Sequence, residues 1–185
     1  MKLNGIFPPI TTPFAFDESL ALDRLRDNVA KYNRTGIAGY VVIGSTGESV
    51  LLTFKEVEQV WAAVKEAAAL GKVLIAGTGV DSTSGTIHRT NRAADLGYQV
   101  ALVKTPFYYK PQMTAEAHVE HYLRVADAVR IPILIYSVPV FTGVAVETPT
   151  VARLSEHPNI IGIKESSGNI QRVAEIIHST PASFQ

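Results

Sequence analysis

The sequence predicts an α/β protein built on a parallel sheet, and three observations lead to this fold class. First, short β-branched runs alternate with longer amphipathic stretches, six times in 185 residues. Second, the short runs are almost continuously apolar, as strands covered on both faces are. Third, residues able to carry chemistry follow several of the runs rather than one. Together these features favour a (β/α)8 barrel, in which the loops after the strands converge on one face.

The six strand candidates are recognised by their apolar content. They cover residues 5–11, 39–43, 73–76, 100–104, 133–136 and 160–164. The helices between them follow from the 3.6-residue spacing of apolar side chains and from end signals. We expect helices over residues 20–34, 53–71, 83–96, 114–129, 148–156 and 169–178. Thr53 and Glu56 form a capping box at the start of the second helix, and Trp61 on its apolar face is expected in the core.

A doubly wound open sheet is the other architecture that this alternation permits. A dinucleotide-binding sheet carries a Gly-rich phosphate loop after its first strand, and the first strand here has none. The Gly-Thr-Gly run at 77–79 lacks the third glycine of that motif. Six units do not close an eight-stranded barrel, so we expect residues 1–185 to form a partial (β/α)8 barrel with strands 1–6 and without strands 7 and 8. Residues 183–185 would open a seventh strand, and the exposed sheet edges would favour self-association.

Composition excludes several classes of function. Lys+Arg and Asp+Glu balance at 17 each, so no basic surplus indicates nucleic acid binding. The absence of cysteine excludes disulfide bonds, thiolate metal sites and a cysteine nucleophile. The N-terminus lacks the apolar core of a signal peptide, and no run approaches the roughly 18 residues of a membrane span. We therefore expect a cytoplasmic protein with neither a nucleic acid nor a membrane as partner.

Two lysines that end predicted strands are candidate nucleophiles. Lys164 ends the run 159–164, and Lys104 ends the run 100–104. At the carboxyl end of a buried strand, desolvation disfavours an ammonium and favours a free amine that attacks a carbonyl. An ordinary lysine whose head reaches solvent is the alternative, and local pattern does not separate the two lysines. Tyr136 ends the strand before Lys164, where its phenol is either a proton shuttle or a core residue.

Two loops after other strands are candidate binding segments. Ser45, Thr46 and Gly47 lie in a Gly-rich loop whose backbone N–H groups and hydroxyls suit a carboxylate. The loop is neither a Walker loop nor a nucleophile elbow, and a plain turn is the alternative. Tyr108 lies in the Pro-bounded loop 105–111, which suits a site, a subunit contact or a rigid surface loop.

His118 and His121 are three residues apart on a predicted helix, a spacing that metal ligands can have. No carboxylate-rich partner accompanies them. We therefore expect both histidines at the surface and no metal site.

Five motifs, taken together and in order, give the chain a recognisable pattern. They are residues 5–14 (GIFPPITTPF), 44–48 (GSTGE), 105–109 (TPFYY), 136–139 (YSVP) and 162–165 (GIKE). In this combination the chain resembles, over its whole length, the dihydrodipicolinate synthase / N-acetylneuraminate lyase family of class I aldolases. The resemblance implies a (β/α)8 barrel, usually assembled as a homotetramer of two tight dimers. It also implies a reaction without a metal or organic cofactor.

The same resemblance implies a role for each candidate residue. Lys164 would form the Schiff base with a pyruvate-like 2-oxo acid. Tyr136 would hydrogen-bond near the substrate carboxylate and relay protons. Ser45 and Thr46 would hold the carboxylate of pyruvate, and Ser45 would also take part in proton transfer. Tyr108 would be offered across the dimer interface to complete the relay.

Phe141 departs from the pattern of the synthases, as does Lys104, where an apolar residue is usual. In the loop Tyr-Asn-Val-Pro-x-Arg-Thr-Gly of those enzymes, the arginine grips the carboxylate of the second substrate, which the phenyl ring of Phe141 cannot do. The runs 136–139 and 157–160 look more like 4-hydroxy-2-oxoglutarate aldolase and related sugar-acid aldolases. We therefore expect cleavage of a hydroxylated 2-oxo acid to pyruvate or glyoxylate plus an aldehyde. Dihydrodipicolinate synthase itself is one alternative, and a non-catalytic 2-oxo-acid-binding relative is another.

Overall fold

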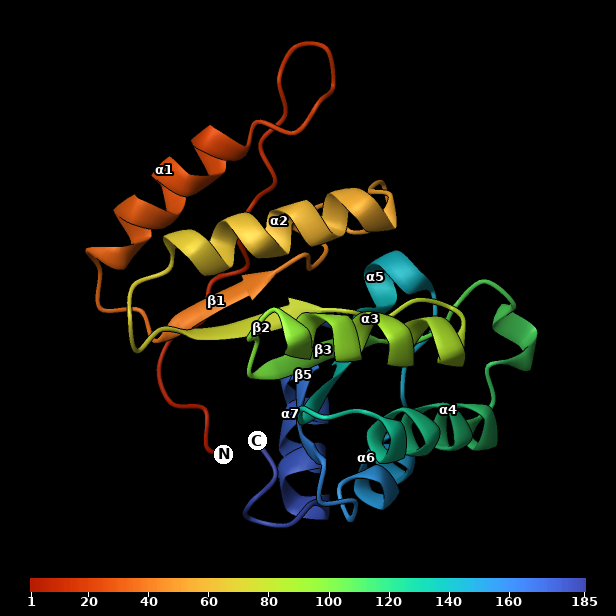
Figure 1. Ribbon diagram of the computed structural model, residues 1–185. Helices are drawn as coiled ribbons and strands as arrows, with labels where there is room; N and C mark the ends of the chain where they lie inside the picture. The colour runs from red at the N-terminus through yellow and green to blue at the C-terminus, as the bar shows by residue number, and fades with distance from the viewer. The chain divides into compact units, whose positions relative to one another are not determined.

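The computed structural model describes residues 1–185, which form two compact units. The first unit comprises residues 3–77 and 92–100, and the second comprises residues 1–2, 78–91 and 101–185. The elements of the first unit (Figure 1) are α1 (Leu22–Asn33), β1 (Gly39–Val42), α2 (Phe54–Ala67) and β2 (Val73–Gly77). Two elements, α3 (Thr83–Asp95) and β3 (Val100–Lys104), have residues in both units. The remaining elements belong to the second unit: η1 (Lys110–Gln112), α4 (Ala115–Ala128), β4 (Ile133–Ser137), α5 (Pro139–Thr142), α6 (Thr148–Leu154), β5 (Ile160–Glu165) and α7 (Ile170–Ser179).

The first unit is built on two parallel strands covered by helices. Gly39 of β1 lies opposite Val73 of β2, and the pairing continues in register to Val42 and Ala76. Every residue of β1 is buried, which explains why its sequence is continuously apolar. Figure 1 shows α1 and α2 side by side near β1, and both helices bury one apolar face in the shared core.

The capping box predicted at the start of α2 is present. The Thr53 hydroxyl accepts a hydrogen bond from the Glu56 backbone N–H, and the Glu56 carboxylate accepts one from the Thr53 N–H at 2.8 Å. Trp61 is fully buried, as predicted, and its carbonyl accepts a hydrogen bond of 3.0 Å from the Tyr98 hydroxyl. These contacts fix α2 against the core of the first unit.

The first predicted strand, residues 5–11, is extended but does not form a regular ladder. It lies parallel to β1, with Ile10 donating to the Val41 carbonyl and Val41 donating to the Pro8 carbonyl, each at 3.0 Å. Pro8 and Pro9 have no N–H to donate, so only an isolated bridge at Pro9 remains. The direction of the segment was therefore predicted correctly, whereas its assignment as a full strand was wrong.

The second unit is built on three parallel strands, β3, β4 and β5. Side chains alternate between the two faces of such strands, so residues of one parity share a face. On one face, β3 and β4 pack against α4, α6 and α7 in a buried apolar core. The members of this core in the strands and helices are Ala101, Val103, Tyr122, Val125, Ala126, Ile133, Ile135, Val151, Leu154, Ile160 and Ile176. We call this side the helix-covered face.

A register shift occurs between β4 and β5. Ile133 lies opposite Ile160, but the next residue, Leu134, lies opposite Gly162, so one residue of β5 is passed over. Such an irregularity moves every later side chain of β5 to the other face. It therefore decides which residue of β5 stands beside Tyr136.

The last residue of the chain lies beside β5. The Gln185 N–H donates to the Ile161 carbonyl at 3.0 Å, and the Gln185 carbonyl accepts from the Ile163 N–H at 2.8 Å. This alternating pattern is that of a neighbouring parallel strand. It agrees with the prediction that residues 183–185 approach the sheet.

The predicted helices are present in the structure. Two short helices were not predicted, and the prediction of where His118 and His121 lie is wrong. The elements α5 and η1 were not predicted, because three or four residues carry no helical period. His118 and His121 were expected at the surface, yet their exposed fractions are 2% and 5%. Both point into the protein because α4 is packed on that side as well. No helix of the structure is both long and apolar enough to cross a membrane.

Candidate active site

Three side chains at the carboxyl ends of neighbouring strands form the centre of the candidate site. Lys104 of β3 lies opposite Tyr136 of β4, and Tyr136 lies opposite Lys164 of β5. Side chains in register on parallel strands point to the same face, here the face opposite the helix-covered one. We call these three residues the Lys–Tyr–Lys row. The sequence singled out all three, but not their alignment, which depends on the register shift in β5.

Lys164 contacts its neighbour in the row directly. Its Nζ lies 3.9 Å from the centre of the Tyr136 ring and donates to the Ser166 Oγ at 3.3 Å. Tyr136 is 4% exposed, whereas Lys164 is half-buried. The amine thus lies on an aromatic face at the rim of the strand ends, where a small carbonyl compound can reach it. Ser166, which sequence reasoning did not select, is found two residues after the lysine.

The strand end that carries Lys164 is fixed from the helix-covered side. The Glu165 carboxylate accepts from Arg172 Nε at 2.9 Å and from the Ser167 N–H at 2.7 Å. Burial alone raises the pKa of Glu165, but the bonds from Arg172 and Ser167 outweigh it and the pKa is lowered. Arg172 also bonds the Val146 carbonyl. The ion pair thus holds β5 and α7 together directly behind Lys164, the candidate nucleophile.

Lys104, the other candidate nucleophile, has different surroundings. Its Nζ lies 4.9 Å from the centre of the Phe107 ring. Burial lowers the pKa of Lys104, while the Asp81 carboxylate acts in the opposite direction and the Arg89 guanidinium lowers it further. The structure thus places two amines in one row, with Lys164 against the tyrosine and Lys104 against Phe107.

The loop that carries Tyr108 is held by one carboxylate. Asp81 Oδ1 accepts from the backbone N–H groups of Phe107 at 2.7 Å and of Tyr108 at 2.8 Å. The Tyr108 side chain itself is 73% exposed and contacts Tyr109 edge to face at 5.0 Å between ring centres. A fixed backbone with an exposed phenol is the arrangement expected of a side chain presented to another molecule.

Phe141 lies on the short helix α5, which follows directly after β4. Its side chain is 70% exposed. Gly143 ends α5 in the left-handed conformation with φ of 65°, and a Cβ placed there would lie 2.9 Å from the Lys110 Cε. The loop around Phe141 therefore presents an exposed phenyl ring on a tightly closed turn.

The Gly-rich loop with Ser45, Thr46 and Gly47 belongs to the first unit. Gly47 is buried, and its carbonyl accepts a hydrogen bond from the Thr12 hydroxyl at 2.8 Å. Ile43, which precedes the loop, has φ of 61°, a conformation that a β-branched residue rarely adopts. Such strain concentrates at functional sites. Ser45 is half-buried and Thr46 is exposed, so the tip of the loop is accessible.

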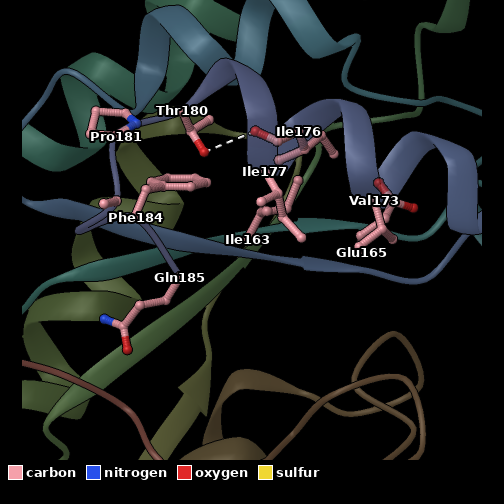
Figure 2. A pocket seen from close by; sticks show the side chains of 10 residues that line it. Ile163, Glu165, Val173, Ile176, Ile177, Thr180, Pro181, Phe184 and Gln185 are labelled. Atoms are coloured by element: carbon pink, nitrogen blue, oxygen red, sulfur yellow. Dashed lines mark hydrogen bonds between the residues drawn. The ribbon is translucent and has the colours of Figure 1, made fainter.

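A largely apolar hollow of the second unit is not the site of the predicted chemistry. It is a cavity between β5, α7 and the end of the chain (Figure 2), and its volume is about 360 Å³. Ile163 and Glu165, which line it, lie on the opposite side of β5 from Lys164. One hydrogen bond crosses its wall, from the Thr180 hydroxyl to the Ile176 carbonyl at 2.9 Å. A substrate in this cavity would not meet the amine.

Comparison with known proteins identifies the family. The sequence profile of the Dihydrodipicolinate synthetase family matches residues 2–185. The chain belongs to this family. The family assignment made from the five sequence motifs is thereby confirmed, and the family's parallel α/β fold agrees with the strands of both units.

Two curated relatives of this chain carry the same name. The 4-hydroxy-tetrahydrodipicolinate synthase of Methanothrix thermoacetophila is 44% identical over 177 residues, which cover 96% of this chain and 59% of that protein. The enzyme of the same name from Stenotrophomonas maltophilia is 40% identical over 184 residues, 100% of this chain and 61% of its own length. The chain thus spans about three fifths of these relatives. None of this supports the expected closeness to 4-hydroxy-2-oxoglutarate aldolase.

Solved structures of the Dihydrodipicolinate synthetase family share the fold. The dihydrodipicolinate synthase of Aquifex aeolicus matches with a TM-score of 0.93 and 36% identity, covering 99% of this chain and 62% of that one. The chloride-inhibited synthase of Acinetobacter baumannii, solved in complex with pyruvate, matches with a TM-score of 0.91 and 36% identity over 96% of this chain and 60% of that one.

Proposed function

We propose that this chain carries the Schiff-base centre of a 4-hydroxy-tetrahydrodipicolinate synthase, which condenses pyruvate with an amino-acid aldehyde. The observation that carries the proposal is the contact between Lys164 Nζ and the Tyr136 ring, at 3.9 Å from its centre. Membership of the family and the name of the curated relatives support it. The sequence favoured aldol cleavage, with the synthase as the alternative, and the relatives favour that alternative.

The chemistry follows from an amine beside a phenol. The free amine of Lys164 attacks the ketone carbon of pyruvate, and loss of one water leaves a protonated imine. The imine withdraws electrons, so the methyl group loses a proton and an enamine forms. The enamine carbon adds to the aldehyde and leaves the imine on Lys164. The amino group of the second substrate then attacks the imine carbon, which closes the ring and releases Lys164 as the free amine. Tyr136 is placed to move protons during these steps, which use side chains alone.

The remaining site residues are part of the same proposal. Ser45, Thr46 and Gly47 hold the carboxylate of the 2-oxo acid through backbone N–H groups and hydroxyls. Ser45 also passes protons, and Tyr108 serves a second copy of the chain in a homo-oligomer. Residues 1–185 then belong to a single (β/α)8 barrel domain as strands 1–6. The match to one solved chain over 99% of this sequence supports this assignment.

The name of the relatives defines the second substrate. A dipicolinate skeleton has seven carbons and two carboxylates. If pyruvate supplies three carbons and one carboxylate, the aldehyde supplies four carbons, the ring nitrogen and the second carboxylate. The second substrate of this chain is therefore a four-carbon amino-acid aldehyde.

Reductive trapping tests the proposal. The protein is mixed with pyruvate, borohydride is added, and the modified peptide is located by mass spectrometry. We expect one pyruvate adduct per chain, on Lys164. Lys164→Arg should remove the adduct, whereas Lys55→Arg, at an exposed lysine on α2, should not. An adduct on Lys104 would reassign the nucleophile, and pyruvate binding without any adduct would indicate a non-catalytic relative.

Phe141 favours a second candidate function, cleavage of a hydroxylated 2-oxo acid. An exposed phenyl ring stands where the synthase pattern has a carboxylate-binding arginine. An aldolase would release pyruvate from 4-hydroxy-2-oxoglutarate in a coupled assay, and Phe141→Arg should not accelerate that release. Release of pyruvate that rises in Phe141→Arg would contradict this use of the phenyl ring.

A further inference from the structure

Lys104 is the one member of the Lys–Tyr–Lys row to which the proposed reaction assigns no role. It lies at the end of β3, in register with Tyr136 and therefore on the same face as Tyr136 and Lys164. Its side chain is half-buried and its Nζ rests against the Phe107 ring rather than against a carboxylate. The nearest acidic influence, Asp81, already accepts two backbone N–H groups. A cation in such a position is available to an anionic ligand.

The spacing of the row shows which part of a ligand Lys104 can reach. Adjacent strands lie about 4.8 Å apart, so the Cα atoms of Lys104 and Lys164 are roughly 10 Å apart, with Tyr136 between them. Lys104 Nζ leans toward the loop after β3, over Phe107, while Lys164 Nζ lies over Tyr136. Pyruvate is only about three bonds of 1.5 Å long. When bonded to Lys164, it ends before Lys104, whereas a longer ligand crosses Tyr136 and reaches it.

Other cations near the site are less well placed. Lys110 is exposed, and its carbon stem packs against Gly143 at the end of α5. Arg172 is bound to Glu165 on the helix-covered side of β5. Phe141 provides no charge at all. Arg89, whose charge acts on Lys104, lies on α3 and not on a strand of the row. Lys104 is thus a strand-end cation in register with Tyr136 and Lys164.

We propose that Lys104 is a specificity-determining residue that binds the distal carboxylate of the second substrate, the end of the ligand farthest from the Schiff base. The inference rests on the proposed function, because the ligand must be bonded to Lys164. It assigns the carboxylate-binding role, which Phe141 cannot fill, to a different strand. An ammonium bonded to a carboxylate in a partly buried site is a charge-assisted hydrogen bond.

The test compares two 2-oxo acids of equal length that differ in the distal carboxylate, 2-oxopentanedioate and 2-oxopentanoate. The concentration of each acid that gives half-maximal borohydride trapping on Lys164 is measured by mass spectrometry. In the unmodified protein, the dicarboxylate should need a roughly tenfold lower concentration, as expected for one hydrogen bond between charged groups. Lys104→Met should abolish this difference and still form the pyruvate adduct on Lys164. Lys104→Arg should retain most of it, and Lys55→Met should behave as the unmodified protein.

Each outcome decides between the two proposals. No adduct on Lys164 with pyruvate would contradict the proposed function and, with it, the inference. Pyruvate trapping with equal trapping of the two longer acids would overturn the role of Lys104 and leave the proposed function intact. A preference that persists in Lys104→Met would assign the carboxylate to another cation. A pyruvate adduct on Lys164 in Lys104→Met shows that the variant is folded.

Discussion

At the scale of single residues, Tyr136 lies between two lysines at the carboxyl ends of three parallel strands. Lys164 and Tyr136 were predictable, because each ends an apolar run and each belongs to a motif. His121 was not, because the helix period of α4 does not reveal that the face carrying it is covered. His121 is buried and its Nδ1 shares a hydrogen bond of 2.9 Å with the Thr83 hydroxyl. Because of this burial, we expect the stability of the protein to depend on pH.

Stability should fall as the pH drops below neutrality because of His121. Burial, then the charge of His118, lowers the pKa of His121 from 6.5 to about 4. A histidine whose pKa is depressed in the folded state takes up a proton more readily in the unfolded state. The contribution of neutral His121 to stability is therefore complete above pH 6.5 and is lost as the pH falls through 4. The full difference amounts to roughly 3 kcal/mol. Urea unfolding at several pH values between 7 and 4.5 measures the slope of the free energy of unfolding against pH.

Two variants separate this effect from the titration of carboxylates. His121→Gln should flatten the slope between pH 6.5 and pH 4.5, whereas His178→Gln, at an exposed position on α7, should leave it unchanged. Equal slopes in all three proteins would mean that the protonation of His121 is not linked to folding.

At the scale of elements, close backbone contacts decide which residues the strands tolerate. Gly39 begins β1 opposite Val73 of β2. A Cβ at Gly39 would lie 1.9 Å from the Val73 carbonyl oxygen, far inside contact distance. Gly36, three residues earlier, has no atom within 4 Å of the corresponding position. Gly36 is therefore a suitable control for a substitution at Gly39, because both glycines lie in one segment and only Gly39 is crowded.

Gly39→Ala should destabilise the protein by several kcal/mol, since the backbone of two paired strands must separate to admit the methyl group. Gly36→Ala should be neutral, or should stabilise the protein by about 0.5 kcal/mol because alanine lowers the conformational entropy of the unfolded chain. Thermal and urea unfolding of both variants provide the measurement. Similar stabilities for the two variants would show that the β1–β2 contact is looser than the structure has it.

At the scale of the whole molecule, apolar side chains are exposed in the loop after β3 and on α5, which follows β4. Tyr108, Tyr109, Val140 and Phe141 are 73%, 67%, 76% and 70% exposed. Exposed apolar groups of this kind mark contact surfaces more often than isolated ones do. They agree with the role across an interface that the family resemblance implies for Tyr108.

We expect the chain to self-associate, and sedimentation velocity should show dimers or larger species at micromolar concentration. Tyr108→Ser combined with Tyr109→Ser should shift the distribution toward the monomer, because the exposed aromatic area is removed. Leu70→Ser, which removes an even more exposed apolar side chain from the first unit, is the control. A monodisperse monomer with a cooperative thermal transition would contradict the expectation.

The sequence by itself determined the helices, the parallel α/β class and the placement of Lys164 and Tyr136 at strand ends. These depend on local properties: apolar periodicity, the capping box at Thr53 and short motifs at strand ends. The tertiary structure alone decided three things, namely the reduction of residues 5–11 to one bridge, the burial of His121 and the alignment of the Lys–Tyr–Lys row. A one-residue shift in β5 places Lys164 beside Tyr136. Strand register is set by contacts between distant segments, and no local pattern encodes it.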